Sequence, residues 1–299
     1  MKNRGFTLIE TAMIMVILGF IIAALIKTIP VMVAQEQERQ QEKSYDTVRA
    51  ALNSFITRED PSAPGTLTAR FPCPAPLNKG PGDLGFAVEQ WDDGADPDPA
   101  ANDDTCDTSA GSGVFAINDG GGNLVGYAGA IPTNTLGISS EHMLDPYKRK
   151  ITYAVSLNMI QRKAIDRGLE GQITIEDETG NPFTNTAQFA LISHGQDGAG
   201  AYSLEGGEAL PCRGGAAADG QNCDFTDASS VTAHIFRDSQ AKLGNSTDFY
   251  DDRLAFSLVD DEDDEWWESV DGINDIRNKN TGIICVGDDC DPTMAAGND

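Results

Sequence analysis

MKNRGFTLIETAMIMVILGFIIAALIK, residues 1–27, is an apolar run with a single acid, Glu10, inside it. As a helix, residues 6–26 would measure about 31 Å, enough to cross the ~30 Å hydrocarbon core of a membrane. Two basic residues precede the run, and this charge bias keeps that end in the cytoplasm. The run therefore predicts a membrane-spanning helix over residues 6–29. A carboxylate in hydrocarbon is costly, so Glu10 requires a partner or a function.

Three interpretations of this run compete. A secretory signal peptide would have a shorter apolar core and a cleavage site of small residues after it, and residues 26–30 fit that pattern poorly. A plain membrane anchor fits the length but leaves Glu10 unexplained. The third interpretation follows from Gly5-Phe6-Thr7-Leu8-Ile9-Glu10, which resembles the cleavage motif of type IV prepilins and type II secretion pseudopilins.

This resemblance implies a processed N-terminus. In the family, a membrane aspartyl peptidase removes a short basic leader, here residues 1–5, by cutting after Gly5. The same enzyme, the prepilin peptidase and N-methyltransferase, then methylates the new terminal residue, here Phe6. The acid five residues into the mature chain, matched by Glu10, is retained for assembly.

Electrostatics agrees with an assembly role for Glu10. Cleavage leaves a cationic amine on Phe6, and Glu10 of one subunit would neutralise the amine of its neighbour in a helical filament. Opposite charges attract far more strongly at low dielectric than in water, and loss of one partner leaves the other charge uncompensated. The pair would therefore fix the register of the subunits as well as hold them together.

The resemblance also implies an architecture, an α+β type IV pilin-like fold. A long N-terminal spine helix, residues 6–57, would span the membrane with its first half and pack on an antiparallel sheet with long disulfide-tied loops. The globular domain, residues 58–299, would lie in the periplasm, held by a single pass through the inner membrane and then assembled into a pilus or pseudopilus. Shorter stretches, at residues 71–75, 144–147 and 192–198, are similar to segments of the same group.

The implied partners are those of a filament subunit. They are the prepilin peptidase, other pilin or pseudopilin subunits, the inner-membrane assembly platform and the membrane itself. The chain has 299 residues and is much longer than the smallest major pilins, which favours a minor subunit. Its motifs do not distinguish a secretion pseudopilus from an adhesive or DNA-uptake pilus, nor a tip position from a shaft position.

Apolar spacing predicts that the helix continues beyond the first apolar run. Between residues 45 and 56, large apolar residues recur every three or four positions, and Asp60-Pro61 ends the pattern. A helix with such a stripe needs a cover, so the downstream domain should pack on it. The residues of the stripe are Tyr45, Val48, Leu52, Phe55 and Ile56.

The downstream domain reads as short strands and long loops. Runs rich in β-formers and bounded by turn residues predict strands, and the absence of a regular strand–helix alternation favours an antiparallel sheet. Residues 159–167 predict a short helix. Residues 58–113 are mostly Pro, Gly, Asp and Ala, which predicts an elaborated surface loop. The predicted strands are residues 114–117, 151–155, 172–175, 189–192 and 254–258.

The six cysteines indicate disulfides in an oxidising compartment. Proximity in the sequence suggests Cys285–Cys290 and Cys212–Cys223, and elimination then leaves Cys73–Cys106. Free buried thiols are the alternative. A zinc site is disfavoured because no C-x-x-C pair occurs and the histidines lie far from the cysteines in the sequence.

Composition and motifs argue against two broad classes of function. With 47 acidic and 21 basic residues the net charge is −26, which disfavours nucleic acid as a partner because phosphate binding needs an excess of Lys and Arg. No nucleophile elbow, zinc-protease motif or P-loop occurs. Ser193 and His194 are adjacent, and adjacent strand residues point to opposite faces. His142, His194 and His234 do not cluster. The chain is predicted not to be an enzyme, with no catalytic residue and no cofactor.

Calcium is the one ligand that the sequence leaves open. Acids alternate at Asp92, Asp96 and Asp98, and calcium prefers such oxygen ligands. An EF-hand register fails because Pro97 stands where glycine is required. The loop at residues 195–198 resembles a calcium loop of major pseudopilins only loosely, since the ligands after it are not reproduced. A solvated acidic loop is the favoured interpretation.

A second acidic segment, residues 260–268 (DDEDDEWWE), contains Trp266 and Trp267. A solvated charge run is the simpler interpretation, and a partner contact is the alternative because aromatic residues are enriched at interfaces. The alternative to a filament subunit is a membrane-anchored periplasmic enzyme or calcium-dependent adhesin, in which the N-terminus serves only as an anchor.

Overall fold

The computed structural model begins with helix α1 (Leu8–Ile56), which is 49 residues long. The chain divides into two compact units, Met1–Lys43 and Ser44–Asp299, so α1 contributes to both. In the first unit α1 becomes polar after residue 34, and Arg39 forms an ion pair at 2.9 Å with Glu36 one turn away. The structure describes residues 8–59, 67–92, 104–109, 111–119, 121–165, 168–177, 179–207, 211–212, 222–223, 235–238, 250–257, 266–269, 275–278 and 284–286.

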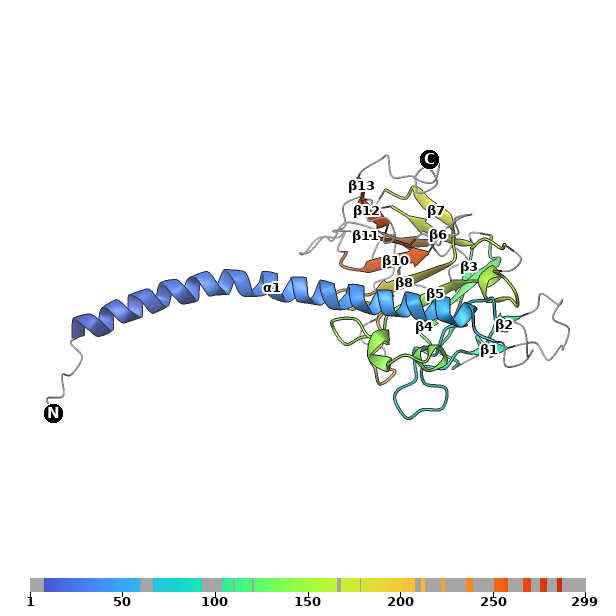
Figure 1. Cartoon of the computed structure of the whole chain (residues 1–299), viewed down its shortest axis with the longest axis horizontal. Helices are drawn as coiled ribbons and strands as arrows, with labels where there is room; N and C mark the ends of the chain where they lie inside the picture. Colours follow the sequence, from blue (N-terminus) through green and yellow to red (C-terminus); the bar gives the residue numbers. More distant parts are fainter. Residues whose placement is uncertain are drawn as a thin grey trace. The chain divides into compact units, whose positions relative to one another are not determined.

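An eight-stranded sheet forms the centre of the second unit, in the order β13-β12-β11-β10-β8-β5-β4-β3. Every neighbouring pair in it is antiparallel. Figure 1 shows β4, β5, β8 and β10 as successive neighbours across it. The strands are β3 (Phe115–Asn118), β4 (Leu124–Ala130), β5 (Thr152–Ser156), β8 (Phe189–Ser193), β10 (Arg253–Ser257), β11 (Trp266–Ser269), β12 (Asp275–Asn278) and β13 (Ile284–Val286).

Two smaller sheets accompany the large one. In the order β7-β6-β9, strand β6 (Ile173–Glu176) pairs antiparallel with β7 (Pro182–Ala187) and parallel with β9 (Ile235–Arg237). An ion pair of 2.8 Å between Glu176 and Arg237 links β6 to β9. A hairpin joins β1 (Trp91–Asp92) to β2 (Thr105–Cys106). The remaining helices are short: α2 (Thr133–Leu136), the 3-10 helix η1 (Ser140–Met143) and α3 (Leu157–Ile160).

One hydrophobic core joins the end of α1 to the central strands. Tyr45, Val48, Leu52 and Phe55 are buried in the same cluster as residues of β5, β8 and β10. The hydroxyl of Tyr45 donates to the backbone carbonyl of Arg253 at 3.2 Å. The stripe predicted between residues 45 and 56 is therefore confirmed, and it buries apolar area as an amphipathic helix should.

The expected pilin-like architecture needs correction. Only the last turns of α1, from Ser44 onward, belong to the unit that contains the sheets, so a long spine helix packed on a sheet is not observed. The expected antiparallel pairing is confirmed for the eight-stranded sheet, whereas the sheet β7-β6-β9 also contains the parallel pair β6 and β9. The result is a mixed α and β fold, in which the helical contribution to the described core is short.

The predicted membrane span over residues 6–29 is corrected as well. Across the described part of the chain, no helix combines the length and the apolar character that a membrane crossing requires. This finding contradicts the expected single pass through the inner membrane and the periplasmic placement that depended on it.

The local predictions within the second unit are mostly accurate. The five predicted strands correspond to β3, β5, β6, β8 and β10, with each boundary within one residue. The predicted helix over 159–167 is wrong, because α3 ends at Ile160 and Lys163 has a positive φ of 57°. Between residues 58 and 113, β1 and β2 are the only strands among the described residues.

Candidate functional site

The processing motif lies at and before the start of α1. Gly5 and Phe6 lie outside the described residues, whereas Glu10 lies in the first turn of α1, which begins at Leu8. The amino end of a helix carries a partial positive charge, so an acid is favoured in its first turn. Glu10 is the only acid between residue 1 and Glu36, and it therefore carries the one negative side chain of this end of the helix.

Apolar side chains follow Glu10 on every face of α1. Seven of them have exposed fractions between 51% and 76%. Helices that are apolar on all sides are normally buried, because no face is suited to water. These side chains are thus exposed although they are apolar. The seven residues are Met13, Ile14, Met15, Val16, Ile17, Leu18 and Phe20.

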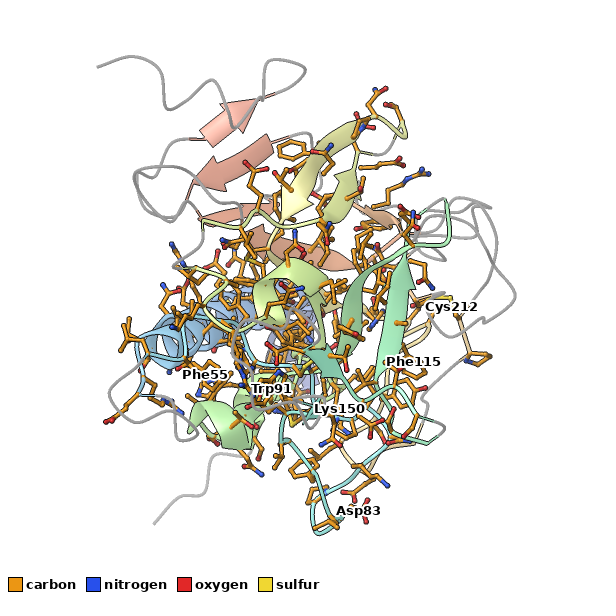
Figure 2. The ribbon with its side chains drawn as sticks, turned by 90° about the vertical axis from the view of Figure 1, so that its right-hand side faces the viewer. Phe55, Asp83, Trp91, Phe115, Lys150 and Cys212 are labelled. Atoms are coloured by element: carbon orange, nitrogen blue, oxygen red, sulfur yellow. A yellow bond between two sulfur atoms is a disulfide. The ribbon has the colours of Figure 1, made fainter. Side chains whose placement is uncertain are left out.

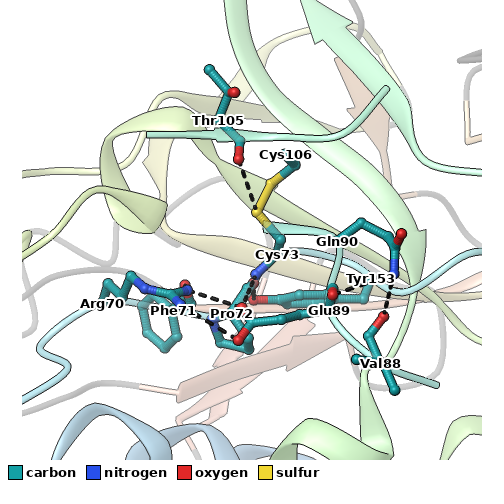
Figure 3. Close-up of a disulfide and its surroundings, with 10 residues drawn as sticks. All are labelled: Arg70, Phe71, Pro72, Cys73, Val88, Glu89, Gln90, Thr105, Cys106 and Tyr153. Carbon is teal, nitrogen blue, oxygen red and sulfur yellow. Dashed lines mark hydrogen bonds and ion pairs between the residues drawn. A yellow bond between two sulfur atoms is a disulfide. The ribbon is translucent and has the colours of Figure 1, made fainter. Parts of the chain in front are cut away.

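The predicted disulfide between Cys73 and Cys106 lies within the long segment at residues 58–113. Cys73 and Cys106 are joined, with 5.7 Å between their Cα atoms, and Cys106 lies opposite Trp91 in the β1–β2 hairpin. Figure 3 shows Glu89 beside this disulfide, where its carboxylate accepts from the N–H of Cys73 at 3.2 Å and from the guanidinium of Arg70 at 3.0 Å. The buried Arg70 also stacks on Trp91, 4.0 Å from the ring centroid.

The acidic stretch at residues 92–104 ends in a buried ion pair. Asp104 accepts from the N–H of Arg162 at 2.8 Å, and the two side chains lie 3.6 Å apart. Asp104 is thus bonded to a cation of its own chain. Of the acids in the calcium hypothesis, Asp96 and Asp98 lie outside the described residues, and Asp92 lies in β1 without a described side chain.

The second calcium candidate, the loop at residues 195–198, is organised by Asp251. The carboxylate of Asp251 accepts from the backbone N–H groups of Gln196 at 2.5 Å and Asp197 at 2.9 Å. Burial raises the pKa of Asp251, and the nearby carboxylate of Asp197 adds to the rise. Among the described residues, no group of three or more His, Cys, Asp or Glu side chains is arranged to hold a metal ion.

Ser193, the last residue of β8, and His194, which follows it, have separate partners. The hydroxyl of Ser193 donates to Asp145 at 3.3 Å, whereas Nε2 of His194 lies 2.8 Å from the hydroxyl of Thr152. Burial lowers the pKa of His194 to about 4, so its ring is neutral near pH 7. Of the other histidines, His142 lies in η1 and His234 lies outside the described residues.

For the other predicted disulfides, one pair is confirmed and the other includes a residue outside the described part of the chain. Cys212 and Cys223 form the second disulfide, with 5.6 Å between their Cα atoms. Cys285 lies in β13 and Cys290 lies outside the described residues, so the third pairing remains a prediction. Trp266 and Trp267 begin β11, and Trp267 pairs with Phe256 of β10 through the backbone.

Sequence reasoning missed the buried ammonium of Lys150. Its ammonium donates to the carbonyl oxygens of Leu77 at 2.7 Å and Lys79 at 2.5 Å. Burial lowers its pKa to about 8, against the opposing effects of Asp83 and Glu205. Lysine is almost never fully buried, so neither its type nor its neighbours in the sequence signalled this position.

We compared the chain with known protein families, curated sequences and solved structures. No protein-family model matches the chain, and no curated protein sequence or solved structure does.

Proposed function

We propose that this chain is a structural subunit of a filament, a minor pilin or pseudopilin that the prepilin peptidase processes after Gly5. The observation that carries the proposal is Glu10 in the first turn of a 49-residue helix whose next apolar residues are exposed on every side. A segment of this kind requires apolar partners around it. Copies of the same segment, or the related helices of other pilin subunits, supply such partners.

In the proposed assembly two interactions join the subunits. Apolar side chains of residues 12–20 pack against the same segment of neighbouring subunits, which removes their area from water. The carboxylate of Glu10 pairs with the cationic amine that cleavage creates on Phe6 of a neighbour. Because that pair lies among apolar side chains, its attraction is strong and its disruption leaves a charge without compensation.

The second unit supports a display role. Its described residues include two disulfides, and disulfides persist where the environment is oxidising. The Cys73–Cys106 bridge closes a separation of 33 residues, which restricts the unfolded chain and stabilises the long segment that contains it. The domain thus presents disulfide-linked loops on a packed core. A minor subunit that makes one specific contact would use such loops for that contact.

The first experiment determines the N-terminus of the mature protein from its native cells by intact mass and peptide sequencing. We expect loss of residues 1–5 and one added methyl group on Phe6. In the variant Gly5→Leu both changes should be absent, because the peptidase requires a small residue before the cut. A mature wild-type chain that retains residues 1–5 would overturn the proposal.

The second experiment tests Glu10 in assembly. Glu10→Val should be cleaved normally and yet be missing from sheared filaments, measured by immunoblot against the wild type. Glu36→Val is the matched control, since it removes an acid from the same helix where the carboxylate is exposed and pairs only with neighbouring turns. Normal incorporation of Glu10→Val, or equal loss in both variants, would contradict the assigned role.

A further inference from the structure

The loop at residues 78–88, here called the tip loop, carries the most exposed large apolar side chain among the described residues. Leu84 has an exposed fraction of 97%, whereas Leu67 and Val88, the other such residues described in the second unit, have 50% and 40%. Figure 2 shows the neighbouring Asp83 at the far end of this loop and Lys150 near its root. Leu84 therefore projects from the domain without a cover of its own.

Hydrogen bonds hold the end of the tip loop in one shape. The carboxylate of Asp83 accepts from the N–H of Gly80 at 2.8 Å, and the N–H of Asp83 donates back to the carbonyl of Gly80 at 3.0 Å. The N–H of Phe86 then donates to the carbonyl of Asp83 at 3.2 Å. Pro81 has a fixed φ between these turns. Leu84 thus lies within the second of two consecutive hydrogen-bonded turns, so its exposure is a property of an ordered backbone.

Hydrogen bonds hold both ends of the tip loop, where the chain enters it and where the chain leaves it. The buried ammonium of Lys150 holds the segment that enters the loop through the carbonyls of Leu77 and Lys79. The side-chain amide of Asn134 donates to the carbonyl of Phe86 at 2.9 Å on the outgoing side. Burial of an ammonium is costly, and here the groups that it bonds are backbone atoms at the root of this loop.

An ordered loop with an exposed apolar tip is suited to binding. Single exposed apolar residues are common on surfaces and need no explanation by themselves. The tip loop differs because its backbone is already held in place, so little conformational entropy would be lost when Leu84 enters a pocket. An aliphatic anchor on a rigid support is the arrangement that a specific interface requires.

Charge identifies the kind of partner. Asp83 adjoins Leu84, whereas the one basic residue of the loop, Lys79, lies at the loop root, where the backbone of Glu205 packs against Gly80. The chain has a net charge of −26, so a second copy or an anionic lipid surface would meet like charge. We propose that Leu84 inserts into an apolar pocket, rimmed by Lys or Arg side chains, on a protein other than this chain. The inference stands on the tip loop alone and does not depend on how the N-terminus is processed.

The test places a photoactivatable amino acid at position 84 of the full chain in its native cells. We expect cross-links to one other protein, with the linked peptide containing both apolar and basic residues. The same probe at position 67 is the matched control, because Leu67 is also exposed but lies outside the tip loop. Cross-links only to a second copy or to lipid, equal cross-links from both positions, or none at all would overturn the proposal.

Binding of the cross-linked protein, once purified, then decides the chemistry. Leu84→Ala should weaken its affinity at least tenfold, with an unchanged thermal unfolding midpoint because the side chain is almost wholly exposed. Glu205→Lys should weaken it severalfold and reduce its dependence on salt, while the hydrogen bonds of Asp83 stay in place. Leu67→Ala should bind as the wild type does. Wild-type affinity in Leu84→Ala or Glu205→Lys would refute the pocket or its basic rim, respectively.

Discussion

The turns at residues 119–123 and 145–149 are built from the same hydrogen bonds in different surroundings. In each, the N–H of the first residue, an aspartate, donates to the carbonyl of the fifth residue at 2.8 Å. The carboxylate of that aspartate accepts from the N–H groups of the third and fifth residues, at 2.8 Å in the first turn and 2.9 Å in the second. The first turn reaches the surface, whereas the second lies against the core.

The two carboxylates respond to these surroundings in opposite ways. The side chain of Asn123 donates to Asp119 at 2.9 Å, and this bond, with the backbone N–H groups, lowers the pKa of Asp119. Asp145 is buried, and burial raises its pKa although the N–H groups of Arg149 and Tyr147 and the hydroxyl of Ser193 act in the other direction. Removal from water therefore outweighs hydrogen bonds that have nearly the same lengths.

A third turn, at residues 177–181, shows where the balance changes. It repeats the pattern, with Asp177 accepting from the N–H groups of Thr179 at 2.8 Å and Asn181 at 2.9 Å. Burial is the largest single influence on Asp177 and acts to raise its pKa, yet the bonds from Thr179 and Asn181 together lower it. The local sequence thus determines the turn, and the depth of the turn determines the charge state of its aspartate.

The largest effect is expected from Asp145→Ala. The change leaves two backbone N–H groups and the hydroxyl of Ser193 without their acceptor in a buried place, and each such group costs on the order of 1 kcal/mol or more. We expect a loss of about 3 kcal/mol in the free energy of unfolding, measured by urea denaturation. Asp177→Ala breaks the same pattern near the surface, where water replaces the carboxylate, and should cost about 1 kcal/mol.

Asp145→Asn separates the hydrogen bonds from the charge. The amide keeps an oxygen for the two backbone N–H groups and removes the cost of a buried charge, so its loss should be well below that of Asp145→Ala. If the two substitutions at residue 145 are equally destabilising, the charge itself holds the turn, and the comparison between the buried and exposed turns fails.

The pH dependence of stability should have opposite signs in the two turns. The folded pKa of Asp145 lies above its ordinary value of 3.8, so its contribution is present below that value and is lost as pH rises through the folded pKa. The folded pKa of Asp119 lies below 3.8, so its contribution is present above that value and is lost as pH falls. Between pH 3 and 7, the stability of the wild type should fall relative to Asp145→Asn and rise relative to Asp119→Asn.

Urea denaturation of the three proteins at half-unit pH intervals measures these slopes. The slopes come from differences between proteins at one pH, so titration of groups far from either turn cancels. Slopes of the same sign for the two variants would show that burial does not decide the charge state at Asp145.

Much of this fold could be predicted from short stretches of sequence, because the composition of those stretches favours the structure that they form. Strands β5 and β8 are dense in β-branched and aromatic residues, and both were predicted to within one residue. Strand β4 was missed because Gly126 and Gly129 reduce its strand propensity. The structure explains Gly126, since a Cβ there would lie 2.5 Å from the carbonyl oxygen of Val155 on the neighbouring strand.

The features that escaped prediction depend on distant contacts. The burial of Asp145 involves Ser193, 48 residues away, and nothing in the local sequence of the turn distinguishes it from its exposed counterparts. Lys150 is buried against Leu77, 73 residues away, and only this contact reveals that the tip loop has a fixed root. The predicted membrane span rested on a local pattern, the apolar composition of one segment. Among the described residues no helix has the length and the apolar character that a span requires.

The smallest effects concern the fourth residue of each turn, whose φ is positive in both: 79° at Gly122 and 66° at Lys148. A side chain in this left-handed region costs roughly 1 kcal/mol, whereas glycine adopts it freely. Gly122→Ala should therefore lose about 1 kcal/mol of unfolding free energy, and Lys148→Gly should gain about 0.5 kcal/mol after the extra entropy of the unfolded glycine is subtracted. Thermal and urea unfolding measure both differences.

Lys148→Ala is the control for the second change, because it removes the same long side chain but keeps a Cβ in the left-handed region. It should be no more stable than the wild type, so that any gain in Lys148→Gly comes from the backbone. If Lys148→Gly and Lys148→Ala have the same stability, the φ of 66° at residue 148 carries no strain. The two turns would then differ in depth alone, and the glycine of the exposed turn would owe its place to something other than the left-handed conformation.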